Sequence, residues 1–381
     1  MQNGKPGVSG GDIRLIEIAN NWSKHNEINL ITSESGKILC EKMGLNVEFH
    51  ITPSSEGTGI GENIKRVFNS LNSITNYNQK IDVVYSACEH LYDVLPSFIL
   101  KYSNHAKWIA VVHWVEEPPW KDMRGNTPFL IRYLYYFNRI ISVWLIKNFA
   151  DKTFAVSYIT AEKLVSKKKF SGDKIEAVAC GVDLQHIQEI VSLNLTFGLE
   201  KKYDAIFMKR LNYGKGILDL IDIWKKVVDR KSDAKLAIIG DGSKEVVQKL
   251  NTKIKEYQLE KNITFLGVIY DQKEKFTYLQ QSKLFILPSY EENWAIVIGE
   301  AMATGVPVIA YNLKEITPIW KDNVTWVEKG NTDKFAERVL DLLNSDSDRE
   351  KICEKALDFV KQYEWSEIAR REFEVSQCLI N

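Results

Sequence analysis

Apolar residues recur along the chain in short runs that are separated by longer amphipathic segments. Runs rich in Val, Ile, Phe and Tyr predict β-strands, and segments with apolar positions three or four residues apart predict α-helices. Regular alternation of the two is typical of βα units that build parallel sheets. In the first half of the chain the predicted strands are INLIT (28–32), VEFHI (47–51), DVVYS (82–86), KWIAVVH (107–113), KTFAVS (152–157) and IEAVA (175–179).

The same alternation repeats in the second half. We expect the crossing between two domains within 183–202, and a long helical pattern from about Asp348 to the end. We therefore predict a first α/β domain over 1–190, a second over 191–362, and a C-terminal helix (363–381) that crosses back onto the first domain. The predicted strands of the second series are YDAIFM (203–208), AKLAIIG (234–240), ITFLG (263–267), LFILPS (284–289), VPVIAY (306–311) and VTWVE (324–328).

Length and composition fit a soluble enzyme of two domains. A chain of 381 residues is too long for one typical core,. The 50 Lys and Arg residues balance 50 Asp and Glu residues, so there is no overall attraction to nucleic acid, and no nucleic-acid-binding motif is present,. Five scattered cysteines without C-x-x-C spacing predict free thiols in a reducing cytoplasm and no structural metal site,. The start, MQNGKPGVSGGD, has no apolar signal region, so we expect a cytoplasmic protein,.

Two glutamates, Glu292 and Glu300, stand on either side of an apolar run in PSYEENWAIVIGEAMATGVPVIAY (288–311). If this run is helical from about Trp294, a rise of 1.5 Å per residue places their backbones about 12 Å apart. Paired glycosidase carboxyls act about 5 to 9.5 Å apart, so the spacing argues against that kind of hydrolysis. Glu292 follows a predicted strand, where doubly wound sheets bind ligands, and the next helix would offer N–H groups to phosphate or sugar oxygens. The spacing suits a pair that binds the two ends of one long ligand. The alternative is that both are solvated glutamates on a surface helix.

A second charged loop follows the predicted strand YDAIFM. In KRLNYGKGILDLI, Arg210 and Lys215 flank a glycine-containing turn that opens the next helix. A guanidinium fork and a point charge beside a helix N-terminus fit a diphosphate. The turn is not a Walker loop, because no Ser or Thr follows the lysine. The alternative is a pair of solvated loop cations.

Together these segments resemble family 4 of the nucleotide-sugar glycosyltransferases, which are retaining enzymes of the GT-B fold. KRLNYGKG (209–216) matches the family's G-R-L-x-x-x-K-G, LAIIGDG (236–242) matches its nucleotide-domain loop, and 288–308 matches its P-S-x-x-E-G-F-G…E-A-M-A-x-G-x-P-V signature. Weaker matches are SGGD (9–12), the strand that ends in His113, and ACGVD (179–183). The resemblance spans nearly the whole chain. It implies an α/β fold of two Rossmann-like, doubly wound domains with parallel sheets that face a central cleft.

The resemblance implies a donor site in the second domain. Glu300 would hold the ribose hydroxyls of the nucleotide, and Glu292 would lie beside the hexose. Arg210 and Lys215 would neutralise the diphosphate, with no metal and no other cofactor. The remaining donor contacts that it implies are the backbone N–H groups of Asn293, Trp294 and Ala295 and the backbone of Val268 beside the base.

In the first domain the resemblance singles out a histidine and two glycines. His113 corresponds to the histidine that faces the sugar from the acceptor side, although a lone histidine at a strand end is also common in cores and loops. Gly10 and Gly11 match the glycine loop that lets the backbone approach the diphosphate and the acceptor.

The chain departs from the family pattern in several places. Asn293 and Ala295 stand where the family has glycine, so we expect this backbone to be less free to adopt positive φ. Lys209 replaces the usual Gly, and Cys180 the usual Asn. The polar segment MQNGKPGVS cannot form the apolar strand that precedes the family's glycine loop, so either the chain is truncated or the first sheet lacks a strand.

The segment FLIRYLYYFNRIISVWLIK (129–147) is aromatic and apolar, but Arg132, Asn138 and Arg139 interrupt it and argue against a transmembrane span,. Residues 121–170 hold ten Lys or Arg against three Asp or Glu. An aromatic, basic helix can lie in a membrane interface, and the acceptor would then be a lipid-linked glycan or polyprenyl carrier at the inner face of the membrane. The alternative is a helix buried between domain layers. We expect GTGIG (57–61) to be a mobile loop near the cleft.

The sequence therefore predicts a metal-independent retaining glycosyltransferase that moves a hexose from a nucleotide diphosphate sugar to a hydroxyl acceptor. A nucleotide-sugar epimerase of the same fold is a rival that the ordered motifs disfavour. A non-catalytic sugar- or partner-binding subunit is a second rival, suggested by the missing strand, Asn293 and Ala295.

Overall fold

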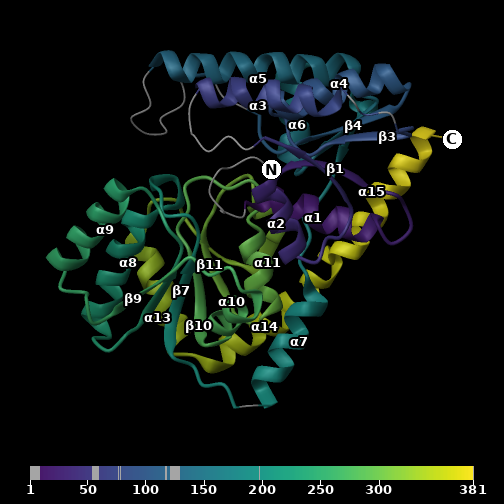
Figure 1. Ribbon diagram of the computed structural model, residues 1–381. Helices are drawn as coiled ribbons and strands as arrows, with labels where there is room; N and C mark the ends of the chain where they lie inside the picture. The colour runs from purple at the N-terminus through teal and green to yellow at the C-terminus, as the bar shows by residue number, and fades with distance from the viewer. Residues whose placement is uncertain are drawn as a thin grey trace. The chain divides into compact units, whose positions relative to one another are not determined.

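The structure is a computed structural model that describes residues 9–53, 60–75, 77, 79–115, 118–120, 129–196 and 198–380 (Figure 1). Contacts divide the chain into unit 1, Met1–Gly181 with Trp365–Asn381, and unit 2, Val182–Glu364. The expectations for residues 1–8 of the polar leading segment and for 57–59 of GTGIG lie outside the described residues. All twelve predicted strands are confirmed, with ends that agree to within two residues. The five cysteines are free thiols.

Unit 2 is built on a six-stranded parallel sheet. Its strand order is β12-β11-β10-β7-β8-β9, which is the Rossmann order, and the order reverses between the neighbouring strands β7 and β10,. Most positions in these strands are buried, which is why they appear in the sequence as continuous apolar runs,. The strands are β7 (Tyr203–Met208), β8 (Leu236–Ile239), β9 (Ile263–Gly267), β10 (Ser282–Leu287), β11 (Val308–Tyr311) and β12 (Thr325–Val327).

Helices cover both faces of this sheet, with α8, α9 and α13 on one face and α7, α10 and α11 on the other (Figure 1). Side chains of Ser243, Asp271 and Asn331 accept hydrogen bonds from first-turn N–H groups and so fix the starts of α9, α10 and α13,. The helices are α7 (Leu184–Thr196), α8 (Ile217–Arg230), α9 (Lys244–Glu256), α10 (Gln272–Gln280), α11 (Ile296–Ala303), α12 (Thr317–Trp320), α13 (Thr332–Leu343) and α14 (Asp346–Val360), with 3-10 turns η2 (Tyr213–Lys215), η3 (Lys321–Asn323) and η4 (Lys361–Tyr363).

Unit 1 has a four-stranded parallel sheet in chain order and a separate parallel pair. The sheet is β3 (Val83–Ser86), β4 (Lys107–Val112), β5 (Lys152–Ala155) and β6 (Ile175–Ala177), and the pair is β1 (Asn29–Ser33) and β2 (Glu48–Thr52). Helices α3, α4 and α5 pack side by side on this unit (Figure 1). The helices are α1 (Gly10–Trp22), α2 (Glu34–Lys42), α3 (Ile60–Ile74), α4 (Leu91–Asn104), α5 (Phe129–Phe149), α6 (Tyr158–Lys168) and α15 (Trp365–Ile380), with the turn η1 (Gly172–Lys174).

The last helix, α15, returns to unit 1 and packs against α1. Arg14 of α1 forms an ion pair with Glu372 of α15, and these side chains are only 2% and 1% exposed. Tyr85 joins the pair, because its hydroxyl accepts from Arg14 at 2.8 Å and donates to Glu372 at 3.1 Å. A buried charge is tolerated when it is paired and hydrogen-bonded, so this cluster fixes α15 to the unit.

Replacing Glu372 with Ala leaves Arg14 buried without its carboxylate, and we expect a loss of about 3–5 kcal/mol in the free energy of unfolding. Chemical denaturation followed by circular dichroism measures this loss. The matched control is Glu374→Ala, which removes an exposed carboxylate from the same helix and is expected to change stability by less than about 0.5 kcal/mol,. Equal unfolding midpoints for the two variants would show that the buried pair does not hold α15.

Candidate active site

The charged loops that stand out in the sequence of unit 2 meet where its strand order reverses. Lys209 and Arg210 directly follow β7, and Glu292 lies in the loop that follows β10, the neighbouring strand. Parallel strands end at the same edge of a sheet, and ligands of doubly wound sheets bind at this point of reversal. The topology thus places these residues at the expected ligand site.

The loop after β7 has a fixed shape. The Asn212 side chain accepts from the backbone N–H of Lys215 at 3.0 Å, which closes the turn η2. Gly216 follows with φ of 69°, and a Cβ at this position would lie 1.7 Å from the carbonyl oxygen of Pro288. Only glycine therefore allows the loops after β7 and β10 to approach this closely.

Hydrogen bonds join these two loops directly. The carbonyl oxygen of Gly214 accepts from the N–H groups of Tyr290 at 2.9 Å and Glu291 at 3.2 Å. The Lys215 ammonium donates in return to the carbonyl oxygen of Glu291 at 2.6 Å. The two loops therefore form one framework around the carboxylate of Glu292.

Glu292 is buried and is surrounded by three donors. Its carboxylate accepts from Lys209 Nζ at 3.1 Å and from Ser289 Oγ at 3.0 Å, and it lies 3.2 Å from Lys215 Nζ. Burial acts to raise the pKa of Glu292, but the charges of Lys209 and Lys215 outweigh it and hold this pKa below its ordinary value,. Glu292 is therefore an ionised carboxylate at neutral pH.

Glu300 lies in the middle of α11 and is also buried. Lys275 of α10 donates to its Oε1 at 2.9 Å, and the Lys275 ammonium lies 4.2 Å from the centroid of the Phe276 ring. Val268 is exposed and directly follows β9, the strand before α10. The helix and loop after β9 therefore contribute to the surroundings of the second glutamate.

The two predicted diphosphate ligands differ in their availability. Arg210 is exposed at the end of β7 and has no ion-pair partner within the described part of the chain. Lys215 is instead engaged with Glu292 and with the carbonyl of Glu291. A diphosphate could reach Arg210 directly, whereas Lys215 would have to leave Glu292 to bind it.

The helix after the first glutamate starts two residues later than the sequence suggested. Ala295 has φ of 58° and ψ of 61°, outside the right-handed helical region, so α11 begins at Ile296 instead of Trp294. Ala295 adopts positive φ although it carries a Cβ, a conformation that is strained for residues other than glycine,. The Trp294 ring is buried against Trp320 at 4.5 Å and Tyr363 at 5.2 Å between centroids. The Trp294 side chain is therefore enclosed by protein, and Asn293 beside it is half-buried.

In unit 1, His113 follows β4 and lies beside the start of α1. Its backbone N–H donates to Glu89 at 2.9 Å, and its Nε2 lies 3.0 Å from the carbonyl oxygen of Ala87, which can only accept, so Nε2 carries a proton,. A Cβ at Gly11 would lie 3.4 Å from the imidazole, and Gly10 is the exposed first residue of α1. Burial lowers the pKa of His113, so the ring is neutral at pH 7,.

A second charged cluster lies behind His113. Glu89 is buried and pairs with Arg139 of α5 at 2.8 Å. Burial acts to raise the pKa of Glu89, but the charge of Arg139 contributes to lowering it to about 2. Burial and the same arginine lower the pKa of His90 to about 3. Arg139, which interrupts the aromatic segment in the sequence, therefore positions the carboxylate that holds the His113 backbone.

Several of these contacts join residues that no sequence motif connects. Lys209 was visible only as a departure from a family motif, and nothing in the sequence paired it with Glu292. Ser289 lies within the recognised signature, but its hydroxyl had no assigned role. Lys275 and Glu89 belong to no motif, and only the fold brings them to Glu300 and His113.

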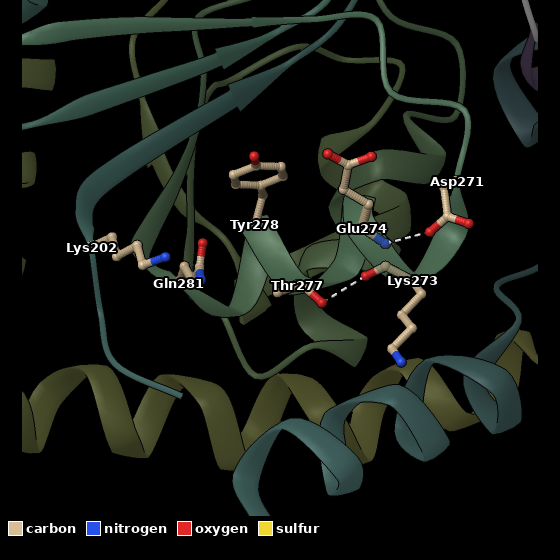
Figure 2. Close-up of a pocket in the computed structure, with 7 residues that line it drawn as sticks. All are labelled: Lys202, Asp271, Lys273, Glu274, Thr277, Tyr278 and Gln281. Carbon is tan, nitrogen blue, oxygen red and sulfur yellow. Dashed lines mark hydrogen bonds between the residues drawn. The ribbon is translucent and has the colours of Figure 1, made fainter. Parts of the chain in front are cut away.

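A groove along α10 is lined by residues other than those above (Figure 2). It runs toward Lys202, which precedes β7 and so lies at the opposite end of that strand from Arg210. The groove is lined by Lys202, Asp271, Lys273, Glu274, Thr277, Tyr278 and Gln281.

In the part of the chain that the structure describes, no group of three or more His, Cys, Asp or Glu side chains is placed to hold a metal ion. No described helix is both long enough and apolar enough to cross a membrane.

Two protein-family models match the chain, one in each half. "Glycosyltransferase Family 4" matches residues 8–186, and "Glycosyl transferases group 1" matches residues 197–359. The second match contains both glutamates and the cationic loop after β7. The first contains His113 and the glycines at the start of α1.

Individual relatives agree with these models. An uncharacterized glycosyltransferase of Methanocaldococcus jannaschii is 26% identical over 78% of this chain and 75% of its own length. The poly(glycerol-phosphate) alpha-glucosyltransferase of Bacillus subtilis is 25% identical over 55% of this chain but only 30% of its own length. The chain spans about half the length of several other curated relatives that it matches. The crystal structure of Anabaena HepE in complex with UDP has a TM-score of 0.74 at 19% identity and covers 99% of this chain and 98% of its own, which shows the same GT-B fold.

We expect Ala295→Gly to stabilise the protein by up to about 1 kcal/mol. Relief of the left-handed conformation returns roughly 1–2 kcal/mol, and the flexibility of glycine offsets about half of this. Thermal unfolding measures the change as a rise in Tm of a few degrees. The control is Ala303→Gly in the last turn of the same helix, which is expected to destabilise by about 1 kcal/mol or more. Equal destabilisation by both substitutions would show that Ala295 is not strained.

Proposed function

The chain belongs to the family 4-like glycosyltransferases of the GT-B fold, and we propose that it is a retaining enzyme that transfers a hexose from a nucleotide diphosphate sugar to a hydroxyl acceptor without a metal ion. The observation that carries the proposal is the arrangement after β7 and β10, where two cations and a buried glutamate meet at the point of strand reversal. The UDP bound to Anabaena HepE supports a nucleoside diphosphate as the leaving group of the donor. The Bacillus relative's name supports a hexose as the transferred group.

The donor is proposed to lie along the loops at this edge of unit 2. Glu300 would hold the ribose hydroxyls through the carboxylate oxygen that Lys275 leaves open,. Val268 would lie beside the base. Arg210 and Lys215 would hold the diphosphate and offset the charge that grows on it as the sugar leaves.

The sugar is proposed to meet Glu292 and the backbone at the start of α11. The free N–H groups at this helix start suit sugar hydroxyls, and the positive φ of Ala295 turns the backbone there,. In the reaction, the bond between the anomeric carbon and the phosphate oxygen breaks while the acceptor oxygen bonds to the same face of the sugar. The acceptor's proton passes to the departing phosphate, so no side-chain base is needed. His113, neutral and N–H-bearing, is proposed to contact the sugar from the acceptor side.

The acceptor is proposed to be a lipid-linked glycan or polyprenyl carrier, reached by peripheral binding to the inner face of a membrane. Residues of α5 form an exposed stripe at helical spacing, with Phe137 61% and Trp144 55% exposed, so this face of the helix is not buried between layers. Ile64 and Phe68 of α3, a helix that packs against α5, are also exposed. Lys168 of α6 lies over the Tyr136 ring of α5 at 5.7 Å and adds positive charge beside the aromatic face. Aromatic side chains flanked by lysines suit an anionic lipid surface.

We expect the protein to bind one of UDP-, GDP- or ADP-hexose in the presence of EDTA, as measured by calorimetry. Glu300→Ala should weaken this binding by about 10-fold or more, because it removes a charged acceptor worth about 1.5–3 kcal/mol. The control is Glu274→Ala, an exposed acid of α10, which should leave the affinity unchanged. Binding that requires added metal, or that survives Glu300→Ala, would contradict the donor assignment.

Release of nucleoside diphosphate in the presence of an acceptor separates the enzyme from its rival, a non-catalytic binding subunit. If donor binds and no acceptor ever causes release, the rival is correct. NMR coupling constants of the product give the anomeric configuration, and inversion relative to the donor would overturn the retaining assignment.

We expect the protein to cosediment with vesicles of anionic phospholipid and to bind neutral vesicles more weakly. The double variant Phe137→Ser/Trp144→Ser should lose most of this binding, because burying one such side chain contributes about 1.5–3 kcal/mol. The control is Leu195→Ser, which removes an exposed apolar side chain from α7 in unit 2. Equal binding of anionic vesicles by the wild type, the double variant and Leu195→Ser would rule out α5 as the contact surface.

A further inference from the structure

Lys215 has two incompatible tasks if the proposed donor assignment is correct. Its ammonium lies 3.2 Å from Glu292 and donates to the carbonyl oxygen of Glu291 at 2.6 Å. The donor diphosphate needs the same ammonium. Binding therefore requires Lys215 to turn away from Glu292, at least in part.

That movement would be costly if Lys215 were the only cation beside Glu292. A buried carboxylate that loses its partner strongly destabilises a protein. Such a carboxylate takes up a proton instead when its pKa rises above the ambient pH. A protonated Glu292 would no longer present a carboxylate to the sugar.

Lys209 supplies a second cation at the opposite oxygen of the same carboxylate. Its Nζ donates to Oε2 at 3.1 Å, whereas Lys215 and Ser289 approach Oε1. The Lys209 side chain is largely buried, and its backbone N–H donates to the carbonyl oxygen of Ile239 at 3.1 Å, which fixes the start of the loop to β8. Lys209 can therefore stay on Glu292 while Lys215 moves.

We propose that Lys209 is a positioning residue that keeps Glu292 ionised and oriented while Lys215 turns from Glu292 to the donor diphosphate. The inference rests on the proposed function. After this transfer the charges balance in two groups. Arg210 and Lys215 carry two positive charges opposite the two negative charges of the diphosphate, and Lys209 with Glu292 forms a neutral pair beside the sugar.

The groups that face Glu292 set its protonation. They are Lys209 from the end of β7, Lys215 from η2 and the hydroxyl of Ser289, and the charge of Glu300 on α11 also acts on Lys209. Without Lys209, departure of Lys215 leaves only Ser289 on the carboxylate. Donor binding is then expected to draw in a proton, and the affinity is expected to rise as the pH falls.

The test is calorimetric titration with the nucleotide sugar that the wild-type protein binds, at pH 7 in two buffers of different ionisation enthalpy. The diphosphate of a nucleotide sugar has no group that titrates near this pH, so proton uptake reports on the protein. For the wild type we expect no uptake. For Lys209→Met we expect uptake approaching one proton and an affinity lower by about 10-fold or more.

Three further variants make the result specific. Lys209→Gln keeps a hydrogen-bond donor near Glu292 but no charge, and should take up a proton like Lys209→Met. Lys209→Arg should restore binding without uptake. The control Lys283→Met removes a cation that pairs with Asp204 at the other end of the same sheet, and should behave like the wild type.

The outcomes separate this inference from the proposed function. Wild-type affinity without proton uptake in both Lys209→Met and Lys209→Gln overturns the role of Lys209 and leaves the donor assignment intact. If the wild type binds none of UDP-, GDP- and ADP-hexose, the proposed function fails and the inference fails with it. Circular dichroism spectra of each variant confirm that the compared proteins are folded.

Discussion

A buried carboxylate must be neutralised, and this constraint organises the site around Glu292. Its partners come from two loops that are far apart in the sequence, with Lys209 and Lys215 after β7 and Ser289 after β10. The loops can deliver these groups only because Gly216 lets them come within backbone contact and because Gly214 accepts from Tyr290 and Glu291. The shape of the site therefore follows from the need to satisfy one ionised group away from water.

The fold determines where that group can be. In unit 2 the chain starts at the centre of the sheet with β7, proceeds outward to β9, and returns to β10 on the other side of β7. The helices that follow β7 and β10, α8 and α11, lie on opposite faces of the sheet (Figure 1), and doubly wound sheets bind ligands where the strand order reverses in this way,. In unit 1 the candidate residues also follow neighbouring strands, with His113 after β4 and Glu89 after β3 at one edge of the sheet.

The sequence predicted the strands well, because buried parallel strands appear as apolar runs that few other elements imitate. It also singled out Glu292, Glu300, Arg210 and Lys215 as candidates, because these lie in ordered motifs beside glycines. It could not predict the partners of the glutamates. Lys209 and Lys275 come from a strand end and a separate helix, and their pairing depends on side-chain directions that spacing does not encode. The start of α11 was misplaced because the helical periodicity around Trp294 says nothing about the φ of Ala295.

The ion pair between Arg14 and Glu372 has a consequence for the order in which the two units can fold during synthesis. Unit 1 is assembled from the two ends of the described chain, and the whole of unit 2 lies between them. During synthesis Arg14 precedes the described strands β1 to β12, and the carboxylate that neutralises it follows all of them. Until then α1 presents a guanidinium and the apolar surface around it without the helix that covers them. Unit 1 is thus completed only after unit 2 has been synthesised, and it depends on α15 to cover α1.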